Sequence, residues 1–138
     1  MNLSDTKEFK VVSKDKLEKL FEAQTVVERE FARVEGFPER LAFGKLEHLS
    51  SAEVCSHIHQ LLWRLSCEIH ELAVATKNAK QWRKEKYLLD ANEALDEVAD
   101  CWAYMITVCL AMGIDEEKLV EVFLKKAQVN LDRVRSRY

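Results

Sequence analysis

The chain has 138 residues, a length that suits one domain with a substantial core and is short for two. Three glycines and one proline are few, and apolar residues make up 48%, so the composition favours an all-helical protein. A net charge of −3 argues against binding a nucleic acid polymer by bulk charge. We expect one all-α domain over 1–138, a four-to-five-helix bundle with residues 1–13 as a loose N-terminal arm.

The sequence shows no sign of export or of a membrane span. The N-terminal residues lack the apolar stretch of a signal peptide, and the apolar run Val98–Met112 contains Asp100 and is shorter than the ~20 residues that cross a bilayer. Four cysteines occur without a CxxC pair, and we interpret them as buried reduced thiols rather than disulfides or metal ligands: Cys55, Cys67, Cys101 and Cys109. We therefore expect a cytoplasmic protein without a membrane partner.

Capping residues and breakers divide the chain into four long helices. A capping box is a polar cap followed three residues later by an acid, and such boxes are visible at Asp15, Ser50 and Asp90. The segment "GFPERLAFG" breaks the pattern between the first two helices. The predicted helices are about 16–34, 51–77, 91–112 stopped by Gly113, and 116–135 capped by Asp115.

The predicted second helix carries an apolar stripe that a carboxylate interrupts. The stripe contains Ile58, Leu61, Leu62, Leu65, Ile69 and Leu72. Glu68 falls inside this stripe and Glu71 lies at its margin. A carboxylate that faces a core without a counter-ion is costly, so the position of Glu68 indicates a bound cation.

The predicted third helix is apolar nearly all round, except for one polar stripe. That stripe contains Glu93, Asp96, Glu97, Asp100, Tyr104 and Thr107. Four acids without a base destabilise a helix by mutual repulsion. A helix that is otherwise apolar on every side is either central or part of a subunit interface, so we expect a homodimer, possibly a tetramer.

The two acid pairs, Glu68 with Glu71 and Glu97 with Asp100, would converge if the second and third helices pack antiparallel. Four carboxylate ligands suit a hard divalent cation such as Mg²⁺. The alternative is that either pair is solvated surface. A di-iron site would need Glu-x-x-His on two helices, whereas His70 lies only two residues after Glu68. The histidines also lack zinc-type spacing.

Two basic segments accompany the acids. "KNAKQWRKEK" joins the acid pairs, and its cations would hold phosphate oxygens while Trp82 stacks on a base. A solvated linker with one anchoring aromatic is the alternative. On the last helix, the spacing of Lys126, Asn130 and Arg133 puts them on one face, where they would bind a polyphosphate. The alternative is that they have no such role, because basic residues are common near a helix C-terminus.

These pieces together resemble the all-alpha nucleotide pyrophosphohydrolases, the MazG-like superfamily, and most closely the dimeric dUTPase branch. The resemblance covers about residues 17–135. The matching motifs, in chain order, are "LFEAQTVVERE" with Gln24, "EIHEL" with Glu68 and Glu71, "KQW" with Lys80 and Trp82, "DEVADCWAY" with Asp96, Glu97 and Asp100, and "KKAQVNLDR" with Lys126, Asn130 and Arg133. Val74, Ala75 and Ala127 depart from the family's pattern at positions where it is polar.

The resemblance implies Mg²⁺-dependent hydrolysis of a deoxynucleoside triphosphate, most simply dUTP, to the monophosphate and pyrophosphate. The metal would be two or more Mg²⁺ ions, for which Mn²⁺ would substitute, held by Glu68, Glu71, Glu97 and Asp100. The phosphates would contact Lys80, Lys126 and Arg133, and the nucleoside Gln24, Trp82 and Asn130. The alternatives are a house-cleaning pyrophosphohydrolase with another or broader base preference, and a non-catalytic helical dimer that binds nucleotide or protein.

Overall fold

The computed structural model describes residues 14–76 and 91–136, and within these ranges every regular element is a helix. The elements are α1 (Lys14–Glu35), α2 (Glu39–Ala42), the 3₁₀ turn η2 (Leu46–His48), α3 (Ala52–Ala75), α4 (Ala91–Met112) and α5 (Glu116–Arg135). The all-α prediction is confirmed, and all four predicted helices are present within a few residues of their expected ends.

The helix caps were predicted less well than the helices. The Asp115 side chain does cap α5, because its Oδ1 accepts a hydrogen bond of 2.8 Å from the backbone N–H of Lys118. The prediction at Asp15 was wrong, since α1 begins at Lys14. The prediction at Ser50 was also wrong, because Ser51 is the capping residue of α3 and makes no side-chain bond there. Asp90 lies outside the described residues. Neither α2, within the breaker segment, nor η2, just after it, was predicted.

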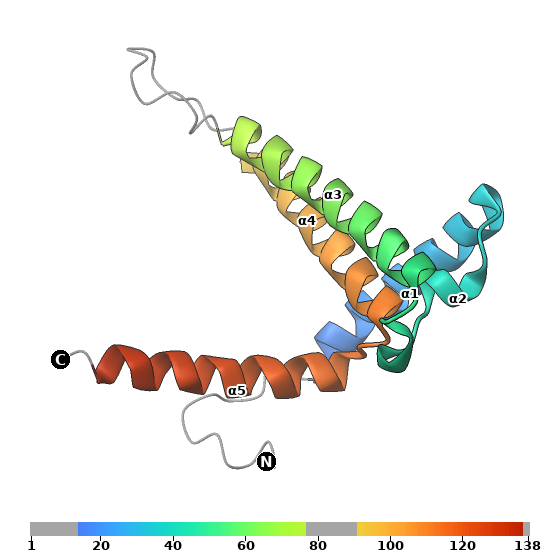
Figure 1. Ribbon diagram of the computed structural model, residues 1–138. Coiled ribbons are helices and arrows are strands. Elements are labelled where there is room, and N and C mark those ends of the chain that lie inside the picture. The colour runs from blue at the N-terminus through green and yellow to red at the C-terminus, as the bar shows by residue number, and fades with distance from the viewer. Residues whose placement is uncertain (1–13, 77–90, 137–138) are drawn as a thin grey trace.

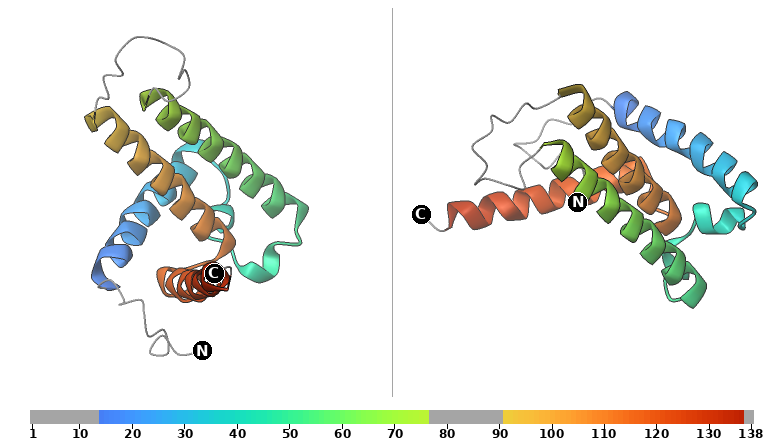
Figure 2. Two further views of the ribbon diagram at one scale, coloured as in Figure 1. Left: turned by 90° about the vertical axis from the view of Figure 1, so that its left-hand side faces the viewer. Right: turned by 90° about the horizontal axis from the view of Figure 1, so that it is seen from above.

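Helices α3 and α4 form the main body as a long antiparallel pair, side by side in all views (Figures 1 and 2). Helix α1 crosses the C-terminal part of α4, and α5 leaves the end of α4 as a separate arm, bent from it by 107°. No single described helix is long and apolar enough to span a membrane; only the bent pair of α4 and α5 passes by length and composition together.

The hydrophobic core lies at the end of the pair where α4 finishes. One cluster joins α2, α3 and α4 through Leu41, Val54, Ile58, Leu61, Val108 and Ala111. A second joins α1 and α4 through Phe21, Ile106 and Cys109, and Leu119 of α5 packs against it. Gly113 ends α4 with a φ of +74°, and the N–H of Ile114 donates to the carbonyl of Cys109 at 2.8 Å. This Schellman turn fixes the direction in which α5 departs.

Burial corrects two predictions from the sequence. Leu62 and Ile69, predicted on the buried stripe of α3, are 43% and 53% exposed. Toward the C-terminal end of α3 the described helices provide only α4 as a neighbour, which covers a narrower face than the apolar pattern suggests. All four cysteines are free, but only Cys109 is buried, and Cys67 is exposed.

Candidate metal centre

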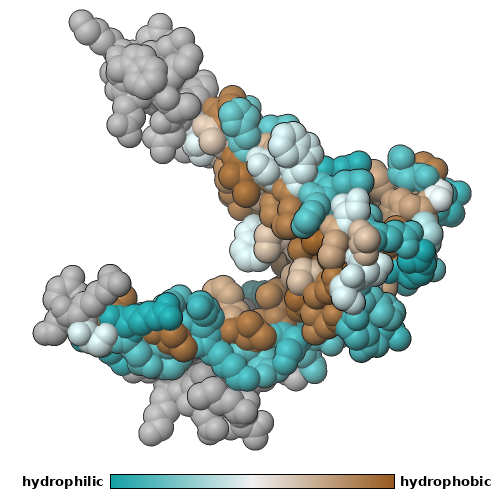
Figure 3. Space-filling view, in the orientation of Figure 1, coloured by the Kyte–Doolittle hydropathy of each residue, from teal (hydrophilic) through white to brown (hydrophobic). Residues whose placement is uncertain are grey.

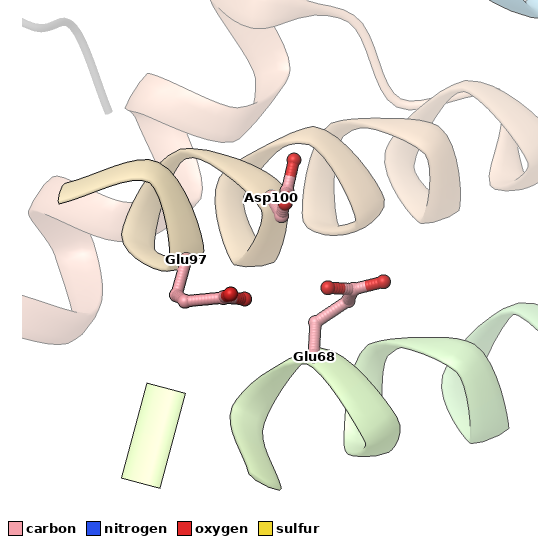
Figure 4. Close-up of side chains that lie close together, drawn as sticks. All are labelled: Glu68, Glu97 and Asp100. Carbon is pink, nitrogen blue, oxygen red and sulfur yellow. The ribbon is translucent and has the colours of Figure 1, made fainter. Parts of the chain in front are cut away.

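Three of the four predicted carboxylates meet between α3 and α4. One oxygen from each of Glu68, Glu97 and Asp100 lies within 4.8 Å of the other two. Glu68 rises from α3, and Glu97 reaches toward it from α4, with Asp100 about one turn further along α4 (Figure 4). The convergence follows from antiparallel packing, because each acid occupies the face that its helix turns toward the other.

The fourth predicted carboxylate, Glu71, stays outside this group of three. Its side chain is exposed at the end of α3. Its charge still reaches the group, since it is among the causes that raise the pKa values of Glu68 and Glu97. Glu71 therefore lies at the rim of the site rather than between the helices.

The electrostatics of the group favour a bound cation. Partial burial is the largest cause of the raised pKa of Glu68, followed by the charges of Glu71, Asp100 and Glu97. Burial likewise leads the causes for the raised pKa of Glu97, followed by neighbouring acids. The same environment raises the pKa of Cys101, so its thiol stays neutral beside the carboxylates.

One oxygen of the group is left without a hydrogen bond. Oε2 of Glu97 is buried and has no hydrogen-bond partner among the residues that the structure describes. A buried acceptor of this kind is costly unless something satisfies it. Mg–O bonds of about 2.1 Å place neighbouring ligands about 3 Å apart and opposite ligands about 4.2 Å apart. The three oxygens, each within 4.8 Å of the others, are of the chemical type that would hold a hard divalent ion.

A cavity of about 620 Å³ opens between α1, α3 and α4, about one helical turn from Glu68 and Asp100, and none of the three carboxylates lines it. Asp100, Tyr104 and Thr107 follow one another along one side of α4, and the last two line the cavity. Gln24, predicted as a nucleoside contact, also lines it. A more open hollow of about 670 Å³ lies over α3 around Trp63 and includes none of the carboxylates.

A hydrogen-bonded triad forms one wall of this cavity. Nε2 of Gln24 donates to Oε1 of Glu28 at 3.1 Å and to Oγ1 of Thr107 at 3.0 Å. The Thr107 hydroxyl in turn donates to Oε1 of Glu28 at 2.9 Å. Glu28 was not singled out in the sequence, although it follows Gln24 by four residues, the spacing that brings two side chains together on a helix.

His57 is a second cavity residue that the sequence analysis did not assign to the site. It packs against Phe37, with ring centroids 5.4 Å apart. Partial burial lowers the pKa of His57; the charge of Glu28 opposes this shift and that of Arg64 adds to it. The imidazole is therefore neutral at pH 7 and offers one donor and one acceptor to the cavity.

The remaining predicted residues are not assembled with the carboxylates in this chain. Lys80 and Trp82 lie outside the described residues. Asn130, Lys126 and Arg133 are exposed on α5, the arm that diverges from α4 by 107°. Their assignment to substrate stays a prediction. Comparison of the chain with protein-family models, with curated proteins and with solved structures finds no match.

Proposed function

We propose that the protein hydrolyses a deoxynucleoside triphosphate to the monophosphate and pyrophosphate with the help of Mg²⁺. The observation that carries the proposal is the trio of Glu68, Glu97 and Asp100, of which one oxygen each lies within 4.8 Å of the other two. Among the described residues, Oε2 of Glu97 is also buried without a hydrogen-bond partner. The resemblance of the sequence motifs to the dUTPase branch makes dUTP the first substrate to test. The proposed working unit is a homodimer in the cytoplasm.

The chain's own residues divide the chemistry between them. Glu68, Glu97 and Asp100 would hold the ions, and bound Mg²⁺ would neutralise the triphosphate and lower the pKa of a water molecule. Water adds to a phosphorus atom as the bond to the leaving pyrophosphate breaks. Glu71, which is exposed at the rim, is proposed to accept the proton of the attacking water. Lys80, Lys126 and Arg133 are proposed to hold phosphate oxygens.

The nucleoside is proposed to occupy the 620 Å³ cavity, because this cavity lies one to two helical turns along α4 from Asp100. Gln24 would contact the base there, and Tyr104 would provide an aromatic wall. Trp82 and Asn130 are proposed as further nucleoside contacts, from the same chain or from the second chain of the homodimer.

The triad in the cavity favours a second candidate, a pyrophosphohydrolase that prefers a base with an exocyclic amine. Both amide hydrogens of Gln24 are used on Glu28 and Thr107, so its carbonyl oxygen remains for a ligand. The second oxygen of Glu28 is likewise an acceptor. Two acceptors complement the amine of cytosine better than the O4 carbonyl of uracil.

A panel of nucleoside triphosphates, assayed for pyrophosphate release with Mg²⁺, with Mn²⁺ and with a chelator, tests the proposal. We expect release only with a divalent ion, and a clear preference for one base. Faster release from dUTP than from dCTP supports a dUTPase, whereas the reverse order supports the amine-selective candidate and equal rates a broad specificity. Nucleotide binding without any turnover would refute the enzymatic proposal and support a non-catalytic binding protein.

A further inference from the structure

The two helices that hold the carboxylates carry very little positive charge. Helices α3 and α4 together contain seven Asp or Glu residues, and Arg64 is their only Lys or Arg. Toward the opening between α4 and α5, hydrophobic surface is visible on both helices (Figure 3). A nucleotide brings further negative charge to this site, so the position of Arg64 decides where α3 and α4 can bind a phosphate with a side chain of their own.

Arg64 lines the end of the 620 Å³ cavity that lies toward the carboxylates. The lining residues of α3 run from Glu53 to Arg64, and Glu68 follows Arg64 by four residues, about 6 Å along the helix. On α4 the lining begins at Ala103, three residues or about 4.5 Å after Asp100. Arg64 therefore stands on α3 between the cavity and the carboxylates.

The guanidinium of Arg64 has no partner in the part of the chain that the structure describes. It forms neither a hydrogen bond nor an ion pair there, although Glu68 lies one turn away on the same helix. Burial and then the charge of Arg64 lower the pKa of the cavity residue His57, against the charge of Glu28. Burial and the charges of three acids raise the pKa of Glu68. The charge of Arg64 thus acts toward the cavity, as expected because helical side chains lean toward the N-terminus of their helix.

We propose that Arg64 binds the phosphate that is attached directly to the nucleoside. The assignment rests on the proposed function, which puts the nucleoside in the cavity. A nucleotide with its base in the cavity and its outer phosphates at the carboxylates has its first phosphate between them, beside Arg64. A guanidinium binds two phosphate oxygens through parallel N–H bonds. Because the reaction releases pyrophosphate, this phosphate stays with the nucleoside, and Arg64 holds the same group in substrate and product.

Binding of nucleoside monophosphates in a chelator tests this contact without hydrolysis. Calorimetric titration of the full chain with dUMP and deoxyuridine, and with dCMP and deoxycytidine, covers both candidate bases. We expect the wild type to bind at least one monophosphate roughly tenfold or more tightly than its nucleoside. Arg64→Gln should lose this preference and keep the affinity for the nucleoside. Arg64→Lys should keep part of the preference, because lysine retains the charge without the planar fork.

Arg29→Gln is the matched control, because it removes one positive charge from a side chain that pairs with Glu39 and does not line the cavity. It should keep the wild-type preference, and circular dichroism reports whether each variant keeps its helices. A wild type that binds monophosphate no better than nucleoside would overturn the proposal. An Arg64→Gln variant that keeps the preference, or that loses affinity for both ligands equally, would overturn it as well.

Pyrophosphate release by the same variants with Mg²⁺ separates this contact from the proposed function. Monophosphate binding that depends on Arg64, without any release, would refute the hydrolase and leave the contact. Release by Arg64→Gln with an unchanged KM would refute the contact and leave the hydrolase. If both hold, the KM of Arg64→Gln should rise roughly tenfold with little change in kcat, since a contact made equally in the ground and transition states lowers KM alone.

Discussion

At the scale of single residues, the molecule gathers negative charge where α3 and α4 face each other. Glu68, Glu97 and Asp100 converge between α3 and α4, and the region of α4 around them has no Lys or Arg. Burial and mutual repulsion raise the pKa values of Glu68 and Glu97. A site of this kind gives up stability in the absence of a cation, and such a cost is typical of functional residues.

Glu97→Gln separates the functional from the structural effect of this charge. We expect Mg²⁺-dependent hydrolysis to fall by roughly 100-fold or more, since even outer-shell partners of a metal contribute up to that factor. In a chelator the same variant should melt at a higher temperature than the wild type, because one of three repelling carboxylates is gone. Glu22→Gln, on the exposed side of α1, serves as the control for a simple change in net charge. Full hydrolysis by Glu97→Gln would contradict the metal assignment.

The buried hydroxyl of Thr107 tests the triad in the cavity. Thr107 is 2% exposed, and Thr107→Val leaves Gln24 and Glu28 each one hydrogen bond short. We expect the free energy of unfolding to fall by about 1–2 kcal/mol, measured by urea denaturation. Thr25→Val is the matched control, because the Thr25 hydroxyl bonds to the carbonyl of Phe21 one turn earlier in its own helix. Equal losses in the two variants would show that the triad adds nothing.

At the scale of elements, the sequence predicted what local rules decide. The long helices follow from apolar residues at helical spacing, from the breaker segment and from the stop at Gly113, although two of the predicted caps were wrong. The meeting of Glu68 with Glu97 follows from two antiparallel helices. The exposure of Leu62 and Ile69 could not be predicted in the same way, because the width of a buried face depends on how many helices cover it. The exclusion of Glu71 from the trio depends on the rotation of α3, and the divergence of α5 on tertiary contacts at Gly113.

The glycine at position 113, in the turn between α4 and α5, should tolerate substitution poorly. Its φ of +74° disfavours any side chain, and an added Cβ would lie 2.6 Å from the carbonyl oxygen of Gly44 and 2.7 Å from Cα of Lys45. We expect Gly113→Ala to lower the free energy of unfolding by about 2–4 kcal/mol, from backbone strain and overpacking together. Gly36 has a similar φ of +72° with open space around it, so Gly36→Ala should lose only about 1 kcal/mol. Similar losses of stability in the two variants, measured by chemical denaturation, would mean that the backbone at Gly44 moves away from the added Cβ at little cost.

The pairing of Glu121 with two lysines on α5 allows a test of surface charge. Hydrogen bonds from Lys125 and Lys118 lower the pKa of Glu121 to about 2. A carboxylate with a lowered pKa in the folded state stabilises the fold above its unfolded pKa of about 4.5, and this contribution disappears as the pH falls toward 2. Glu121→Gln should therefore melt below the wild type at pH 7, and the difference should shrink between about pH 4.5 and 2 and in high salt. A difference that does not change with pH would exclude this pairing as its cause.

At the scale of the whole molecule, the two ends of the α3–α4 pair have different roles. The end with α1, α2 and the start of α5 contains both hydrophobic clusters. The carboxylates lie toward the other end, where the described chain provides only two helices. At this end, α4 leaves four large apolar side chains between 39% and 65% exposed: Leu95, Val98, Trp102 and Met105.

The proposed homodimer would make folding depend on protein concentration. If α5 and these exposed residues of α4 are covered only in the dimer, unfolding follows mass action, because one dimer gives two unfolded chains. A tenfold dilution then lowers the apparent free energy of unfolding by about 1.4 kcal/mol per dimer. The thermal midpoint of the wild type should therefore fall steadily on dilution, measured by fluorescence or circular dichroism. Trp102→Glu should melt at one temperature at every concentration, and Trp63→Gln should keep the wild-type slope. A wild-type midpoint that does not depend on concentration would mean that the chain folds as a monomer with α5 uncovered. We expect the opposite, because the apolar side chains of α5 need a covering surface.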